Sequence, residues 1–148
     1  MIGRALTELL KSNGHDVVPV VRRAAFNGEI AWNPAAGEID ASGLAAANVD
    51  AVVHLAGAGI GDQRWNAAYK DELVSSRVKS TELLSGAIAG LAVKPKVFVS
   101  GSAIGYYGNR GDEVLTEESG PGDGFLADLC QVWERATGAA EAAGVRTV

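Results

Sequence analysis

Short apolar runs recur along the chain, separated by longer stretches whose apolar residues are spaced as on one face of a helix. The runs at 17–21, 50–57 and 96–100 are rich in valine and are bounded by charged or turn-forming residues. Continuous runs of this kind are typical of strands that are buried on both faces of a parallel sheet. A further run starts at 145 and reaches the last residue, and a short one lies near 30–32. These runs predict the strands of the fold.

Helical spacing of apolar residues predicts three helices between the strands. The first helix opens the chain and ends at the turn signal at 12–14, the second carries an apolar stripe over 74–88, and the third occupies 125–143. Residues 24–49 contain three glycines and one proline among small residues and are predicted to form a loop around one short strand. Strands that alternate with helices imply crossover connections, so the predicted fold class is α/β with a doubly wound parallel sheet.

Composition and charge are those of an ordinary globular protein. The chain has 148 residues, of which 47% are apolar and 21% charged, which is enough for one hydrophobic core. Thirteen basic and eighteen acidic residues give a net charge of -5, so we expect no nucleic-acid partner. No apolar run approaches the ~18 residues of a membrane span, and we expect no membrane partner. The single cysteine, Cys130, excludes an intramolecular disulfide and favours a reducing, cytoplasmic setting.

Small or polar residues follow each predicted strand, at the sheet edge where ligands of doubly wound proteins bind. These segments lie at 21–23, 55–59 and 100–103. A nicotinamide dinucleotide needs an acid after the second strand for its ribose hydroxyls, or a basic group there for a 2′-phosphate. Arg22 and Arg23 occupy this place without an acid, which favours NADP over NAD. The alternative is that both arginines form a solvated strand end.

An ordered set of short motifs extends over essentially the whole chain. It includes Val-Val-Arg-Arg at 20–23, Trp-Asn-Pro at 32–34, Val-Val-His-Leu-Ala-Gly at 52–57, Ser-Arg at 76–77, Ser-Ala-Ile-Gly-Tyr-Tyr-Gly at 102–108 and Thr-Glu-Glu at 116–118. In this order the motifs resemble the atypical extended short-chain dehydrogenase/reductases, the sugar-nucleotide epimerase-like "epimerase family" proteins. The resemblance implies an NADP-binding Rossmann domain followed by a smaller C-terminal substrate domain.

The resemblance also implies roles for individual residues. Arg22 is expected to contact the adenosine 2′-phosphate, and Ser102 matches the serine that hydrogen-bonds the substrate oxygen in catalytic relatives. Arg77 takes the place of an asparagine and is expected to reach the cofactor phosphates or ribose, with Glu72 nearby. The alternative for these two is a surface ion pair, whose i, i+5 spacing helical geometry disfavours. The full set of predicted cofactor-binding residues is Gly3, Val21, Arg22, Arg23, Leu55, Ala56, Gly57, Glu72, Arg77 and Ser100.

The chain departs from the catalytic relatives at their Tyr-x-x-x-Lys pair, in which the lysine and the cofactor ribose lower the pKa of the tyrosine. None of Tyr69, Tyr106 and Tyr107 has a lysine four residues later. The predicted last helix carries leucine or cysteine in place of the tyrosine, and tryptophan or glutamate in place of the lysine. Tyr106 is the predicted replacement acid beside Ser102, with Tyr107 as its neighbour. The alternative is that both tyrosines only anchor a loop.

Two functions from different classes stay open at this point. The first is the NADP-binding portion of an epimerase/dehydratase-like oxidoreductase that acts on an unidentified small-molecule substrate. The second, which the missing pair favours, is a non-catalytic NADP-binding sensor or scaffold module; a degenerate fragment without activity is a third. His54 is predicted to be a hydrogen-bonded core residue, because it lies inside a strand, and Cys130 a small core residue.

The dinucleotide fingerprint is predicted to be incomplete. It has three glycines spaced three apart after the first strand, so if Gly3 is the third glycine the second would precede Met1. The preceding strand would lie between those at 17–21 and 50–57. We therefore expect 1–148 to be a partial Rossmann domain, a fragment without its first strand and without the substrate domain. Alone it is expected to exchange strands or dimerise into a homo-oligomer and to bind NADP weakly.

Overall fold

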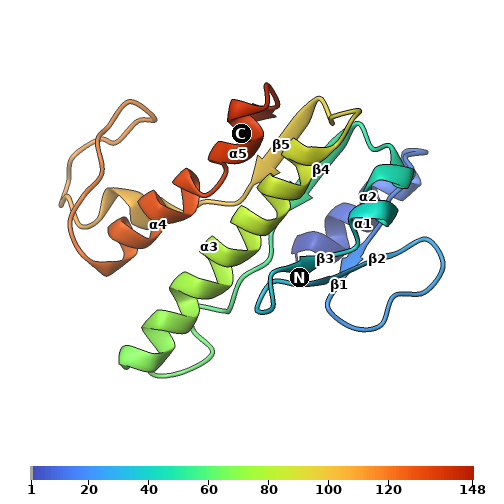
Figure 1. Cartoon of the computed structure of the whole chain (residues 1–148). Coiled ribbons are helices and arrows are strands. Elements are labelled where there is room, and N and C mark those ends of the chain that lie inside the picture. The colour runs from blue at the N-terminus through green and yellow to red at the C-terminus, as the bar shows by residue number, and fades with distance from the viewer. Residues whose placement is uncertain (1) are drawn as a thin grey trace.

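The computed structural model describes residues 2–148, which form an α/β fold (Figure 1). The strands are β1 (Val20–Val21), β2 (Ile30–Asn33), β3 (Glu38–Ile39), β4 (Ala51–His54), β5 (Val97–Ser100) and β6 (Arg146–Thr147). The helices are α1 (Ile2–Ser12), α2 (Ala41–Ala47), α3 (Ala67–Gly90), α4 (Phe125–Arg135) and α5 (Gly138–Ala142), with a 3-10 turn, η1 (Ile104–Tyr107).

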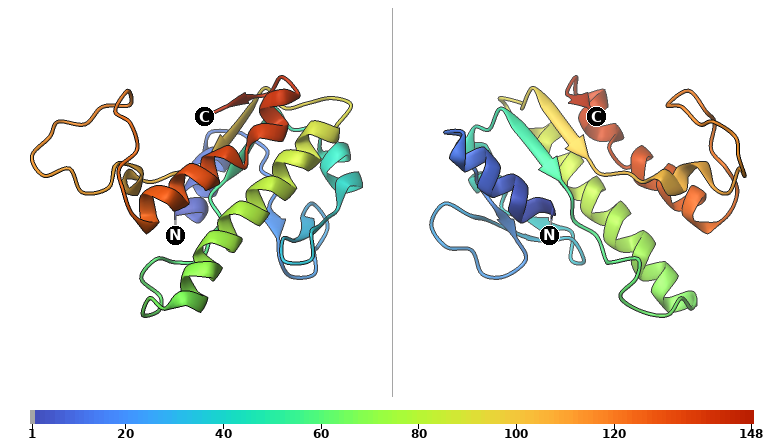
Figure 2. Two further views of the ribbon diagram at one scale, coloured as in Figure 1. Left: turned by 60° about the vertical axis from the view of Figure 1, so that its left-hand side comes forward. Right: turned by 180° about the vertical axis from the view of Figure 1, so that it is seen from behind.

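The strands pair in two groups of three, in the orders β1-β2-β3 and β4-β5-β6. β1 is parallel to β2, and β4, β5 and β6 are parallel to one another. Helices lie on both sides of the strands: α3 is in front of them in Figure 1, whereas α1 is in front in the view from behind (Figure 2). This arrangement confirms the predicted doubly wound α/β class. Within residues 2–148, no strand pairs with the second edge of β1 or of β4.

The core lies between α3 and the inner face of the β4-β5-β6 group. Phe98 and Ile88 have no exposed surface, and they belong to a cluster completed by Trp32, Val52, Leu84, Ala140 and Val145. The expectation that the β4 run is buried on both faces is wrong, because Val52 and His54 are buried whereas Val53 is 42% exposed. The reason is that α3 covers only one face of β4. On the other side, α1 buries none of its own residues.

Several predicted boundaries differ from the structure for local reasons. Only Val20 and Val21 of the run at 17–21 form a strand. The predicted loop at 24–49 contains β3, which is antiparallel to β2, and also α2. Asp40 starts α2 by accepting a hydrogen bond of 2.9 Å from the Gly43 N–H, a normal N-cap interaction.

The predicted last helix is divided into α4 and α5 at Ala136 and Thr137. Ser85 of α3 sits at this break. Its hydroxyl donates to the Thr137 carbonyl at 2.7 Å and accepts from the Ala140 N–H at 2.8 Å. The buried hydroxyl thus replaces the helical hydrogen bonds that are lost at the break. Within residues 2–148, no helix combines the length and the apolar character needed to cross a bilayer.

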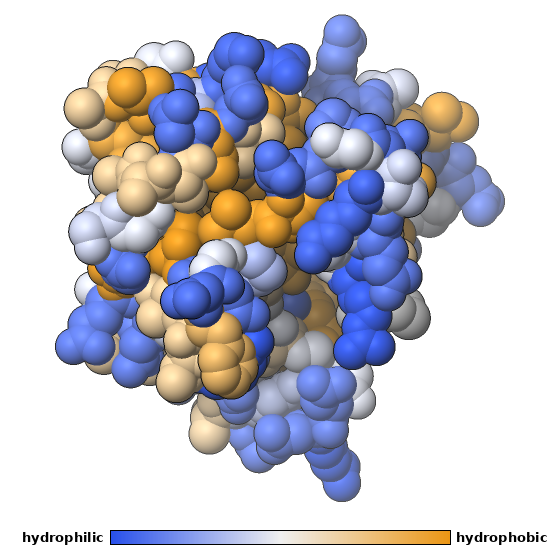
Figure 3. Space-filling view, turned by 90° about the vertical axis from the view of Figure 1, so that its right-hand side faces the viewer, coloured by the Kyte–Doolittle hydropathy of each residue, from blue (hydrophilic) through white to orange (hydrophobic). Residues whose placement is uncertain are grey.

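Two parts of the surface stand out. The segment between η1 and α4 projects away from the rest of the chain (Figure 1). On the side that carries β1–β3 and α2, a band of apolar atoms crosses the middle of the face between polar side chains (Figure 3). The predicted partial-domain organisation, with a substrate domain outside these residues, stays a prediction.

Candidate functional site

The loop after β4 is fastened to α3 by three side chains. The Ala58 N–H donates to Ser76 Oγ at 3.1 Å, and Arg77 Nη2 donates to the Ala58 carbonyl at 3.0 Å. About two turns nearer the start of α3, the Tyr69 hydroxyl donates to the Gly59 carbonyl. These contacts hold the small residues that precede Ala58 in place beside the helix.

A cavity of about 370 Å³ lies between α3 and the ends of β1 and β2, and we call it the larger cavity. Its strand side is formed by Arg22, Trp32, Asn33, Pro34 and Ala35, and its floor includes Ala56 and Gly57. Its helix side is formed by Glu72, Ser75, Ser76, Lys79 and Ser80. Cationic, hydroxyl and amide groups therefore converge on a site with small residues at its base.

The two neighbouring arginines after β1 have different environments. Arg23 forms two hydrogen bonds of 2.7 Å to the carboxylate of Glu29, and its guanidinium lies over the Phe26 ring. The hydrogen bond from Arg23, followed by that from the Phe26 N–H, lowers the pKa of Glu29 to about 2. Arg22 lines the larger cavity and forms no ion pair within residues 2–148. Of the pair, only Arg22 is available to an anionic ligand.

Trp32 and Ser80, which line the larger cavity, both contact the buried His54. The Trp32 and His54 rings meet edge to face, with centroids 5.7 Å apart, and His54 Nε2 lies 3.0 Å from Ser80 Oγ. Burial lowers the pKa of His54 to about 4, so the ring is neutral at pH 7. His54 is thus a hydrogen-bonded core residue, as the sequence predicts.

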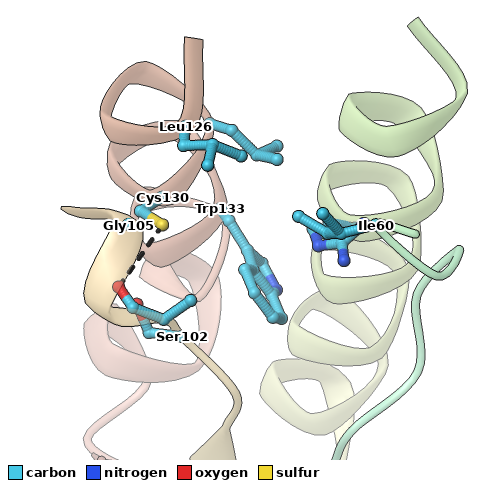
Figure 4. A pocket seen from close by; sticks show the side chains of 9 residues that line it. Ile60, Ser102, Gly105, Leu126, Cys130 and Trp133 are labelled. Atoms are coloured by element: carbon cyan, nitrogen blue, oxygen red, sulfur yellow. Dashed lines mark hydrogen bonds between the residues drawn. The ribbon is translucent and has the colours of Figure 1, made fainter. Parts of the chain in front are cut away.

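A second cavity, of about 200 Å³ and called here the smaller cavity, lies between α4 and the segment after β5 (Figure 4). Trp133 projects from α4 toward α3, where its Nε1 donates to Thr81 Oγ1 at 3.1 Å. The guanidinium of Arg77 lies 5.1 Å from the centre of the Trp133 ring. The remaining lining residues are Ile60, Ser102, Ala103, Gly105, Leu126, Leu129 and Cys130.

Polar groups gather at one end of the smaller cavity. Ser102 Oγ donates to Glu134 Oε1 at 2.5 Å, and Cys130 Sγ donates to the Ala103 carbonyl at 3.6 Å. Burial, and next the Glu134 carboxylate, raise the pKa of the Cys130 thiol, which is therefore protonated at neutral pH. Cys130 and Glu134 are four residues apart and share one face of α4.

Four of the predicted cofactor residues come together in the larger cavity: Arg22, Ala56, Gly57 and Glu72. Arg77 is buried and lies in the smaller cavity, where its guanidinium donates to the Leu73 and Ala58 carbonyls. It forms no ion pair with Glu72, so the surface-pair alternative is wrong. Arg77 therefore holds the backbone of the loop after β4.

The other predicted residues lie outside both cavities, apart from Ser102, which lines the smaller one. Val21 is half-buried in β1, and Leu55 is 44% exposed. Gly3 lies on the exposed α1, and the buried hydroxyl of Ser100 has no hydrogen-bond partner within residues 2–148. Arg23 is occupied by Glu29.

Tyr106 is also outside both cavities. It lies in η1, where its ring packs edge to face on Tyr107 with centroids 5.2 Å apart. The structure therefore does not bring its ring into the cavity that Ser102 lines.

Two residues received no role from the sequence: Lys79, which lines the larger cavity, and Glu134, which accepts a hydrogen bond from Ser102 of the smaller cavity. Lys79 follows Ser75 and Ser76 at helical spacing, which was the available signal for its position in the larger cavity. Glu134 is four residues after Cys130. Cys130 and Glu134 therefore occupy one of the two pairs of positions at which a Tyr-x-x-x-Lys pair is expected. No cluster of three or more side chains suited to a metal ion occurs among the residues that the structure describes.

The sequence profile of the NAD-dependent epimerase/dehydratase family matches residues 1–124. The chain belongs to this family. An epimerase family protein of Mycobacterium leprae is 47% identical over 149 residues, covering 100% of this chain and 47% of that protein. The chain thus spans about half the length of this epimerase family relative.

Two solved structures are similar to this chain in fold as well as in sequence. The nucleoside-diphosphate sugar epimerase from Corynebacterium glutamicum aligns with a TM-score of 0.84 and 39% identity, over 99% of this chain and 30% of that chain. The human epimerase family protein SDR39U1 (isoform 2), solved with NADPH, aligns with a TM-score of 0.76 and 34% identity, over 93% of this chain and 45% of that chain. Both matches confirm the resemblance to extended short-chain dehydrogenase/reductases and the Rossmann-type fold.

Proposed function

We propose that the larger cavity binds the adenosine 2′-phosphate portion of NADP. The observation that carries this proposal is the contrast between the arginines after β1, since Arg23 is paired with Glu29 and Arg22 is left facing the cavity. A planar guanidinium suits a phosphate because it donates two parallel hydrogen bonds. The solved structure of the human family member with NADPH supports the same cofactor.

Small residues at the base of the cavity suit a closely held dinucleotide. A Cβ atom at Gly57 would lie 3.3 Å from Cγ and Cζ of Arg77, a side chain held by backbone carbonyls. A larger residue at this position would therefore displace the loop or narrow the cavity. Ala56, the residue before Gly57, also has a small side chain and lines the same cavity.

The chain is proposed to be the NADP-binding portion of an epimerase/dehydratase-like oxidoreductase. NADP, when bound, supplies the acceptor for a hydride. Ser102 is proposed to hydrogen-bond a substrate hydroxyl and to pass its proton to Glu134, which already accepts from Ser102. In this oxidation the C–H bond breaks with its electron pair going to the cofactor, the O–H proton goes to Glu134, and a carbonyl forms. Tyr106 stays a candidate acid near Ser102 in the chain.

A non-catalytic NADP-binding module is the second candidate. The observation that favours it is the face of α4 occupied by Cys130 and Glu134, which lacks the tyrosine and lysine of catalytic relatives. Hydride exchange from labelled NADPH, lost on Ser102→Ala, would support the enzyme. Binding without exchange would support the module.

Cofactor choice is tested by titrating the fluorescence of NADPH and NADH with the protein. Arg22→Ala is expected to weaken NADPH binding about tenfold and to leave NADH binding unchanged, because only NADPH carries the 2′-phosphate. Arg23→Ala is the matched control, since it removes the adjacent arginine, whose partner is Glu29. Equal effects of Arg22→Ala on both cofactors would contradict the proposal.

A further inference from the structure

We infer that Lys79 is a second binding residue for the 2′-phosphate and that it acts together with Arg22 to select NADP over NAD. The inference rests on the proposed function of the larger cavity and adds a specificity-determining residue on α3. It depends on three observations: both cations line the cavity, neither forms an ion pair with an acid of the protein, and the nearby serine hydroxyls already form hydrogen bonds within the protein.

Arg22 and Trp32 line the same cavity. In the parallel pairing of β1 with β2, Val21 lies opposite Ala31. Arg22 follows directly after β1 and Trp32 is the next residue of β2, and both line the cavity. The end of β1 thus brings Arg22 to the strand side of the cavity.

Lys79 lines the helix side of the same cavity, next to Ser80. Trp32 packs against His54, and His54 Nε2 lies 3.0 Å from Ser80 Oγ. Lys79 is the residue before Ser80 and, like Arg22, lines the cavity. A chain of direct contacts therefore connects the strand that places Arg22 with the turn of α3 that carries Lys79.

Neither cation is neutralised by an acid of the protein. Within residues 2–148, neither Arg22 nor Lys79 takes part in an ion pair. Glu72 lines the same cavity but precedes Lys79 by seven residues, which is about two turns or about 10 Å along α3. Two unpaired cations that line one cavity, in a chain of net charge -5, match the charge of about -1.5 to -2 on a phosphomonoester at pH 7.

The hydroxyls on this wall are already engaged with the protein. Ser80 donates to backbone carbonyls of its own helix, Ser75 donates to the carbonyl one turn earlier, and Ser76 accepts from the Ala58 N–H. The phosphate oxygens would therefore take most of their hydrogen bonds from the guanidinium of Arg22 and the ammonium of Lys79. NAD lacks the 2′-phosphate, so it has no group at this position for Arg22 and Lys79 to bind.

Calorimetric titration with adenosine 2′,5′-bisphosphate and with 5′-AMP isolates the 2′-phosphate from the rest of the cofactor. Lys79→Met keeps a long, unbranched side chain but removes its charge. It is expected to weaken binding of the bisphosphate about tenfold and binding of 5′-AMP less than twofold. Lys79→Arg is expected to restore binding to within about threefold. Circular dichroism of each variant checks the fold.

Lys70→Met is the matched control, because Lys70 lies on the same helix but has its ammonium over the Phe125 ring, outside the larger cavity. If Lys79→Met leaves the preference for the bisphosphate intact while Arg22→Ala removes it, the inference about Lys79 is wrong and the proposed function stands. If the unmodified chain itself shows no preference for the bisphosphate over 5′-AMP, the proposed function fails and the inference fails with it.

Discussion

Ser102 Oγ donates a hydrogen bond of 2.5 Å to Glu134 Oε1, which joins the segment after β5 to the face of α4 that also carries Cys130. The thiol lies one helical turn from Glu134 and lines the smaller cavity with Ser102. Cys130 and Glu134 are at one of the pairs of α4 positions where the resemblance to catalytic relatives predicts a tyrosine and a lysine, and Ser102 hydrogen-bonds to the carboxylate of this pair. Because Cys130 is the single cysteine, the rate at which a thiol reagent modifies the protein measures the reactivity of Cys130 alone.

Removing the negative charge of Glu134 is expected to make Cys130 more reactive. Burial is the largest cause of the raised pKa of the thiol, and the Glu134 carboxylate is the next. Glu134→Gln removes the second cause, so alkylation by iodoacetamide at pH 8 should become about threefold faster. Mass spectrometry of the labelled protein measures the rate.

Glu141→Gln is the control for this prediction. Glu141 also accepts from a hydroxyl, that of Thr137, but it belongs to α5 and does not line the smaller cavity. Its substitution should leave the alkylation rate unchanged. Equal rates in Glu134→Gln and the unmodified chain would contradict the electrostatic coupling of Glu134 to Cys130.

The buried imidazole of His54 makes stability depend on pH. Its pKa is lowered from 6.5 to about 4 by burial, so the unfolded chain binds a proton on this ring at a pH where the folded chain does not. The stabilising contribution is complete above pH 6.5 and is lost as the pH falls toward 4, by about 3 kcal/mol in all. Urea unfolding between pH 4.5 and 7.5 measures this loss.

A pair of variants separates His54 from other acid effects. His54→Gln should lower the stability at pH 7 but flatten its dependence on pH between 6.5 and 4.5. His15→Gln should leave the dependence as it is, because His15 is exposed. A folded-state titration of the His54 ring near pH 6.5, observed by NMR, would overturn this prediction.

The alternation of strands and helices could be predicted from the sequence because it depends on local patterns. The apolar runs predicted β4 and β5. The small residues after these runs lie in segments that line the two cavities. The exposed face of β4 could not be predicted, since Val53 is exposed only because α1 buries none of its residues. The α2 helix was missed because Asp40 and the alanines that follow it give a cap and a propensity but no apolar periodicity.

The roles of charged residues could not be read from sequence spacing, because they depend on tertiary contacts. Arg22 and Arg23 are adjacent and alike in sequence, and only the fold shows that Glu29 occupies Arg23. The resemblance predicts that Arg77 contacts the cofactor, yet its guanidinium is directed to backbone carbonyls and to Trp133. Residues far apart in the chain decide each of these outcomes.

Loss of Arg77 is therefore expected to act through stability first. Arg77→Met would leave the Ala58 carbonyl without the Arg77 donor, remove one of the donors to the Leu73 carbonyl and remove the cation over Trp133. Breaking these buried charge-assisted hydrogen bonds should lower the free energy of unfolding by about 2–3 kcal/mol. Urea unfolding measures the change, and Arg64→Met, at an exposed position, is the control. A change below about 0.5 kcal/mol would contradict this role.

The segment between η1 and α4 is expected to depend on Gly122. A Cβ atom there would collide with the Tyr107 carbonyl and lie 2.8 Å from Gly108 N, while the Gly122 N–H donates to the Tyr106 carbonyl at 2.9 Å. Gly122→Ala should thus separate the segment from η1 at a cost of about 1–3 kcal/mol. Limited trypsin digestion should cut after Arg110 about tenfold faster in this variant.

Gly120→Ala is the matched control for the loop, because a Cβ atom at Gly120 would meet no atom within 4 Å. The same cutting rate in both variants would show that the contact with η1 does not hold the segment. A faster rate confined to Gly122→Ala would show that the close packing of Gly122 on the backbone of η1, with the hydrogen bond from its N–H to the Tyr106 carbonyl, holds the segment in place.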